Sequence, residues 1–145
     1  MLDSYRDLID GFLHTPTALR DALGTPVPDE VAADTASTLQ ELRVREAVNL
    51  RRVQSVMRRE PILLLAIQDE PDIKALAAGD GPEGTPEDHL ATFSHDRSEL
   101  ISVLVNLTLK DWERPINHDR TGETTLADEL DDHLTWDEGI VACLT

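Results

Sequence analysis

The stretch TLADELDDHLTWDEGIVACL, residues 125–144, decides the fold. Its apolar residues recur every three to four positions, which is the period of a helix that buries one face. Thr124 or Thr125 can cap the start of this helix. Continuing the apolar stripe requires positions 133 and 137, which hold His133 and Asp137. We therefore predict that this imidazole and this carboxylate turn toward the protein interior.

Three further segments show the same helical period. They run from about Leu2 to Leu23, from about Ser37 to Glu60 and from Thr85 to about Leu109, and a short helix is predicted from Asp72 to Ala78. Clusters of Gly and Pro separate them, and none alternates strictly as a strand would. Aromatic residues make up only 3% of the chain, which favours packed helices with an aliphatic core. We predict an all-α four-helix bundle, a single domain over residues 1–145, with long connections between helices 2 and 3 and between helices 3 and 4.

Several local expectations follow from single residues. Pro16 either kinks the first helix or marks a restart after His14, with Thr15 as the cap. The sequence TPED at residues 85–88 predicts a capped helix start with carboxylates over its positive end. The tract from Asn117 to Arg120 is typical of an exposed turn, and Cys143 is expected as a small apolar core residue.

The charge balance excludes some classes of partner. The formal net charge of −16 repels a phosphate backbone and anionic lipid surfaces, so neither nucleic acid nor membrane is expected as a partner. No apolar run approaches the ~20 residues that a bilayer requires, and no export signal is seen, which predicts a cytoplasmic protein. One cysteine excludes an internal disulfide. The cations at residues 51, 52, 58 and 59 are expected to pair with the acidic helices, or to bind a substrate carboxylate.

The candidate site combines two helices. Glu46 and Asn49 fall on the apolar stripe of the second long segment, as His133 and Asp137 do on the last. An imidazole, carboxylates and an amide oxygen together suit a divalent metal ion. The alternative is that these side chains only hydrogen-bond to each other or to a dimer partner. His89 and His95 are expected in solvent, His118 is expected in an exposed turn, His14 lies beside the helix break at Pro16, and none of the four is expected as a ligand.

Several motifs resemble the DinB/YfiT-like superfamily of small four-helix bundles. The segments that carry the resemblance are TPTAL (15–19), VREAVNL (44–50), RREP (58–61), LKDWERP (109–115), TGETTL (121–126) and HLTWD (133–137). The resemblance implies a bundle that often forms a homodimer and often holds nickel, zinc or a similar ion on three histidines. Some relatives are thiol-dependent transferases or isomerases, so a small-molecule substrate is an expected partner.

This sequence departs from the family pattern at the ligands. His133 matches one histidine, Asp137 stands where the second belongs, and Asn49 stands near the third, although the alignment can slip to Leu50. Two hypotheses follow. In the first, the protein is a DinB-like bundle with a degenerate His/Asp/Asn site that is weak or inactive in metal binding. In the second, it is a metal-dependent transferase or hydrolase using His133 and Asp137, with nickel, zinc or manganese as its ion.

Overall fold

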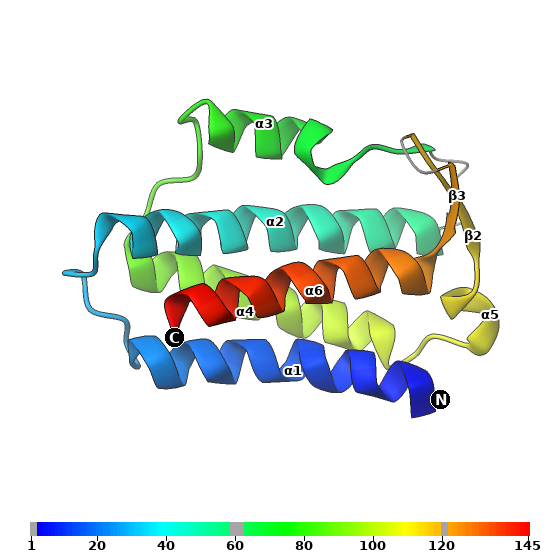
Figure 1. Cartoon of the computed structure of the whole chain (residues 1–145), viewed down its shortest axis with the longest axis horizontal. Coiled ribbons are helices and arrows are strands. Elements are labelled where there is room, and N and C mark those ends of the chain that lie inside the picture. Colours follow the sequence, from blue (N-terminus) through cyan, green and yellow to red (C-terminus); the bar gives the residue numbers. More distant parts are fainter. Residues whose placement is uncertain (1–2, 59–62, 120–121) are drawn as a thin grey trace.

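Four long helices lie side by side and form most of the molecule (Figure 1). The computed structural model describes residues 3–58, 63–119 and 122–145. The long helices are α1 (Asp3–Leu23), α2 (Ala33–Met57), α4 (Pro86–Leu104) and α6 (Leu126–Leu144). Helix α2 contacts both α4 and α6, and α1 contacts the same two helices from the other side. The prediction of a mostly helical chain is therefore confirmed.

A small sheet, which the sequence analysis did not predict, closes one end of the helices (Figure 1). Its strands are β1 (Leu63–Leu64), β2 (Pro115–His118) and β3 (Gly122–Thr125). Strand β2 lies in the middle, parallel to β1 and antiparallel to β3. The predicted turn from Asn117 to Arg120 was wrong at Asn117 and His118, which end strand β2 and pair with β1, whereas Asp119 does lie in a turn. Residue Arg120 of that turn lies outside the described residues.

The long connections carry short helices. They are the 3-10 turn η1 (Ile67–Asp69), α3 (Pro71–Ala77) and α5 (Leu109–Trp112). The predicted short helix is thus confirmed as α3, one residue earlier at each end. The prediction that the third long helix reaches Leu109 was wrong, because α4 ends at Leu104. Thr108 and Asp111 form a capping box that starts α5 instead.

Capping residues fix the starts of α4 and α6 as expected. Thr85 and Asp88 cap each other's backbone at the start of α4, and Thr125 caps α6. Helix α1 passes through Pro16 without ending, so of the two alternatives at Pro16 the restart after His14 was wrong. A proline lacks the N–H that would bond the carbonyl four residues earlier, which leaves the Phe12 carbonyl free for another donor.

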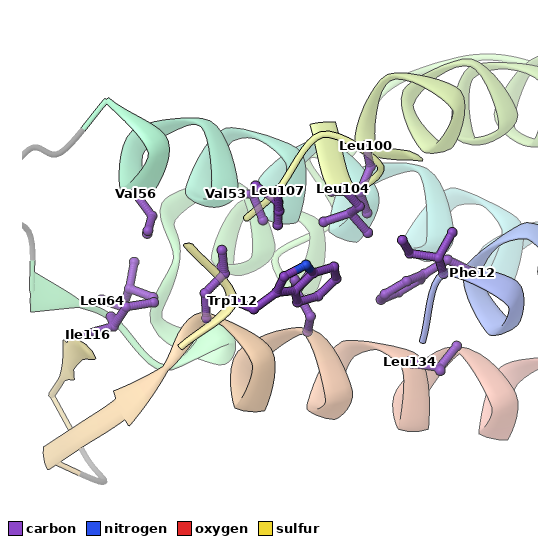
Figure 2. Close-up of a cluster of buried hydrophobic side chains, with 13 residues drawn as sticks. Phe12, Val53, Val56, Leu64, Leu100, Leu104, Leu107, Trp112, Ile116 and Leu134 are labelled. Carbon is purple, nitrogen blue, oxygen red and sulfur yellow. The ribbon is translucent and has the colours of Figure 1, made fainter. Parts of the chain in front are cut away.

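The apolar core is divided into two clusters. One lies toward the sheet and surrounds Trp112 (Figure 2). The Trp112 ring also stacks on Tyr5, with ring centroids 4.7 Å apart. The other gathers Leu19, Leu42 and Phe93 at the opposite end of the helices. The core is largely aliphatic, as the composition indicates. In the described part of the chain, no helix is long and apolar enough to span a bilayer.

The predictions of exposure for His89 and of burial for Cys143 were wrong. His89 is buried, because it faces α2 and its Nδ1 lies 3.4 Å from Arg43 Nη1. Cys143 is exposed, whereas its helix neighbours Ile140, Val141 and Leu144 are the ones that pack against the second apolar cluster. His95 is exposed as expected, and His14 is exposed too.

Candidate functional site

A layer of buried polar side chains separates the two apolar clusters. Each long helix contributes one side chain to this layer, at the point where its buried face passes from one apolar cluster to the other. These side chains are Thr15 of α1, Glu46 of α2, Arg97 of α4 and Asp137 of α6. The exposed fraction of each of these four residues is at most 2%. Polar groups this deep are stable only when they pair with each other.

Arg97 is the centre of this layer. Its Nε and Nη2 donate to the two carboxylate oxygens of Glu46 at 2.7 and 2.8 Å. Nη2 also donates to Asp137 Oδ2 at 2.6 Å, and Nη1 donates to the Phe12 carbonyl at 3.0 Å. That carbonyl is the one left free by Pro16, so the proline that interrupts the hydrogen bonds of α1 provides an acceptor for Arg97. One guanidinium thereby links all four long helices.

The layer brings together three of the four predicted site residues. His133 Nε2 lies 2.8 Å from Glu46 Oε1, and Glu46 and Asp137 share Arg97. The prediction that His133 and Asp137 turn inward is confirmed, because both are buried. Asn49 is buried too, but its Nδ2 donates to the Arg45 carbonyl at 2.9 Å instead of joining the layer. Its neighbour Leu50 is half-buried against the apolar cluster.

Arg97 was not among the site residues predicted from the sequence. A signal for it was present, since position 97 lies four residues after Phe93 and three before Leu100 on the buried stripe of α4. The sequence does not show which carboxylates Arg97 will meet, and an arginine on an apolar stripe can also extend its guanidinium group to solvent.

Arg51 and Arg52 of α2 form ion pairs with acidic side chains, as predicted. Arg52 pairs with Glu70 at 2.8 Å and Glu129 at 3.2 Å, and Arg51 pairs with Asp72 at 3.2 Å. Arg59 lies outside the described residues. The expectation that His118 is exposed was wrong, because strand β2 holds it half-buried beside Asp119 and Glu129.

The pKa values of the two buried carboxylates are shifted in opposite directions. Burial raises the pKa of Glu46, but the hydrogen bonds and charges of Arg97 and His133 outweigh this and hold the pKa at about 2. Burial also raises the pKa of Asp137, and there the charges of His133 and Arg97 do not offset it fully. Glu46 is therefore the firmly ionised partner of Arg97, and Asp137 is the weaker one.

These shifts predict how the protein unfolds in acid. The ordinary pKa of Glu46 is 4.5, so the stabilisation of the folded state by its ionised form is complete above pH 4.5. This stabilisation is lost as pH falls toward about 2. The shift corresponds to about 3 kcal/mol of stability. The raised pKa of Asp137 acts in the opposite sense, because its protonation favours the folded state. We expect Asp137→Asn to make acid unfolding steeper, measured by circular dichroism along a pH series.

An exposed carboxylate provides the control for this series. Asp72→Asn removes the same charge from the surface of α3 and should leave the shape of the acid profile unchanged. Equal acid profiles for wild type and Asp137→Asn would contradict the assignment of opposing carboxylates.

The layer does not fit the metal ion that the resemblance implies. Both Glu46 oxygens and Asp137 Oδ2 bond to a cation that the protein already supplies, and His133 Nε2 is directed at Glu46. The two ligand atoms left without a partner among the described residues are His133 Nδ1 and Asp137 Oδ1. Within the same residues, no group of three or more His, Cys, Asp or Glu side chains is placed to hold an ion. A divalent ion here would also meet the positive charge of Arg97.

The chain was compared with protein-family models, curated proteins and solved structures. No family model, curated protein or solved structure matches it. The resemblance to the DinB/YfiT-like superfamily therefore depends on the motifs in the sequence alone.

Proposed function

We propose that this protein is a DinB-like four-helix bundle that works without a metal ion, as a non-catalytic module in which Arg97 serves as the central cation. The observation that carries the proposal is the pairing of Arg97 with both Glu46 and Asp137, two of the residues predicted as metal ligands. Its fixed positive charge neutralises them as an ion would, and its hydrogen bonds reach every long helix.

Two features of the layer support this role over a metal-dependent one. A guanidinium is always charged and needs no loading, so the helices are held together whatever metals are present. The fork of Arg97 also matches the Glu46 carboxylate in a bidentate arrangement, which is the strongest geometry for such a pair.

Metal analysis tests the proposal. Protein purified without a metal-affinity tag is expected to contain far less than one equivalent of nickel, zinc or manganese, and to take up none after incubation with each. The measurement is inductively coupled plasma mass spectrometry after gel filtration. Uptake of one equivalent, abolished by His133→Ala, would contradict the proposal and favour the metal-dependent transferase or hydrolase.

A variant of Arg97 is expected to respond to metal where the wild-type protein does not. Arg97→Gln removes the cation and leaves Glu46 and Asp137 facing each other, so added zinc should raise its thermal stability while leaving wild type unchanged. Arg51→Gln, which removes a surface arginine from α2, is the matched control and should not respond to zinc.

The homodimer implied by the resemblance is part of the proposal and has a separate test. We expect a dimer by light scattering coupled to gel filtration, and a monomer at all concentrations would contradict this part alone.

A further inference from the structure

A pocket of about 320 Å³ lies between α3, the connection that follows it, and the long helices α2 and α4. Helix α3 runs along the outside of α2 and forms one of its walls (Figure 1). The lining residues are Arg43, Val44, Ala47, Asp72, Ala75, Asp80, Gly81, Pro82, Thr92 and Asp96. None of them belongs to the buried polar layer. The volume is at the small end for ligand pockets, which restricts the pocket to a small molecule.

The connection after α3 is held against α2. Gln40 Nε2 donates to the Pro82 carbonyl at 2.8 Å, and Arg43 Nη1 donates to the Glu83 carbonyl at 3.3 Å. Gly81 packs so closely that an added Cβ would lie 2.7 Å from Gln40 Nε2. This wall of the pocket is therefore fixed by the fold and does not depend on a ligand to order it.

Arg43 is a cation of the pocket that lacks a counter-ion in contact. Its hydrogen-bond contacts involve only Nη1, which reaches the Glu83 carbonyl and lies 3.4 Å from His89 Nδ1. The charge of Arg43 acts on Asp88 and Asp96, but neither carboxylate forms an ion pair with it. Among the described residues, its Nε and Nη2 have no hydrogen-bond partner, and neither atom is fully buried. Two of its three guanidinium nitrogens are thus available to an anion.

Asp96 is the matching anion on α4. Its side chain is half-buried, its oxygens are not fully enclosed, and it has no hydrogen bond or ion pair within the described residues. Burial raises the pKa of Asp96, and the charge of Arg43 does not offset this fully. Of the other two lining carboxylates, Asp72 is already paired with Arg51, and Asp80 is exposed. Asp96 is therefore the lining carboxylate that gains most from a cation supplied by a ligand.

The two charges lie at different levels along α4. The Arg43 guanidinium reaches the first turn of α4 at His89, whereas Asp96 is seven residues further along, which is about two helical turns or roughly 10 Å. Thr92 lies between these levels and also lines the pocket. An arginine and a carboxylate thus line one pocket without pairing with each other. A ligand that carries an anion at one end and a cation at the other pairs with both.

The same charges disfavour a ligand of a single charge. A simple carboxylate meets the repulsion of Asp80 and Asp96, and a simple amine meets the repulsion of Arg43. A zwitterion leaves Arg43 and Asp96 both paired. The space between them also has apolar walls, which suit a short hydrocarbon frame and come from Val44, Ala47, Ala75 and Pro82.

We propose that this pocket binds a small amino acid with a short apolar frame, whose carboxylate pairs with Arg43 and whose ammonium group pairs with Asp96. The inference goes beyond the proposed function and is independent of it, because no lining residue is among the predicted metal ligands. The outcome of the metal analysis therefore leaves it unchanged.

The test is a titration followed by two-dimensional ¹H–¹⁵N NMR with matched probes. Valine is compared with isobutylamine, which lacks the acid, and with isovalerate, which lacks the amine. A second amino acid with a wider charge separation, γ-aminobutyrate, is compared with propylamine and butyrate in the same way. We expect at least one of the two amino acids to shift resonances of the pocket residues and to bind about tenfold or more tightly than both of its analogues.

Two variants assign each end of the ligand. Asp96→Asn should weaken binding of the amino acid about tenfold, since it removes the counter-charge of the ammonium group, and should bind the acid analogue more tightly than wild type does. Arg43→Gln should weaken binding of the amino acid by a similar factor and should bind the amine analogue more tightly than wild type does. A variant that had simply lost its fold would gain affinity for neither analogue.

Two control variants remove the same charges outside the pocket. Glu99→Gln lies on α4 and Lys110→Gln on α5, both positions are exposed, and both variants should bind the amino acid as wild type does. The inference is overturned if neither amino acid binds, or if each binds no better than its amine or acid analogue. Equal losses in the control and pocket variants, or the absence of the opposite gains for the two analogues, also overturn it.

Discussion

Arg97→Met is expected to lower the free energy of unfolding by about 3–5 kcal/mol, because it leaves buried carboxylates without their cation. The methionine fills part of the volume, so the loss comes from charge rather than from a cavity. Glu46 and Asp137 would face each other across the layer, and the Phe12 carbonyl would lose its donor. For a chain of this length, the midpoint of thermal unfolding should fall by roughly 10 °C.

Urea denaturation followed by circular dichroism measures this effect. Arg51→Met is the matched control, since it removes an arginine from an exposed ion pair between α2 and Asp72 and should change stability by only about 0.5 kcal/mol. The role of Arg97 as the central cation would be refuted by equal losses in the two variants.

Glu46→Gln should be nearly as destabilising as the loss of Arg97, at about 3 kcal/mol or more. The carboxylate of Glu46 accepts two hydrogen bonds from Arg97 and contacts His133, so an amide in its place leaves the guanidinium without its main counter-charge. The same amide presents an N–H where Arg97 requires an acceptor, which adds an unfavourable contact.

Asp137→Asn is the informative partner of that experiment. Burial already works against the charged form of Asp137, and an amide keeps one oxygen for Arg97 while placing an N–H at the position of the unpartnered Oδ1. At neutral pH we expect a change within about 1 kcal/mol in either direction. Chemical denaturation of Glu46→Gln and Asp137→Asn in one buffer gives the comparison. Equal destabilisation would show that the two carboxylates stabilise the buried layer equally.

The helices could largely be predicted from residues close in sequence. A hydroxyl followed three residues later by a carboxylate placed the start of α4 at Thr85, and the apolar period placed Glu46, His133 and Asp137 on buried faces. The sheet could not be predicted in this way, since β1 and β2 are separated by about fifty residues and each is too short to show alternation.

The sequence by itself determined that Glu46, His133 and Asp137 face inward, because the helical period is a local property of the chain. Only the tertiary structure decided what they meet there: Arg97 arrives from α4 between Glu46 and Asp137, and the carbonyl freed by Pro16 lies within its reach. Such pairing depends on the packing and relative shift of helices that are distant in sequence. The period within one helix carries no information about which side chains of other helices it will meet. The residues that looked like metal ligands in the sequence therefore turn out to pair with Arg97, a cation of the protein itself.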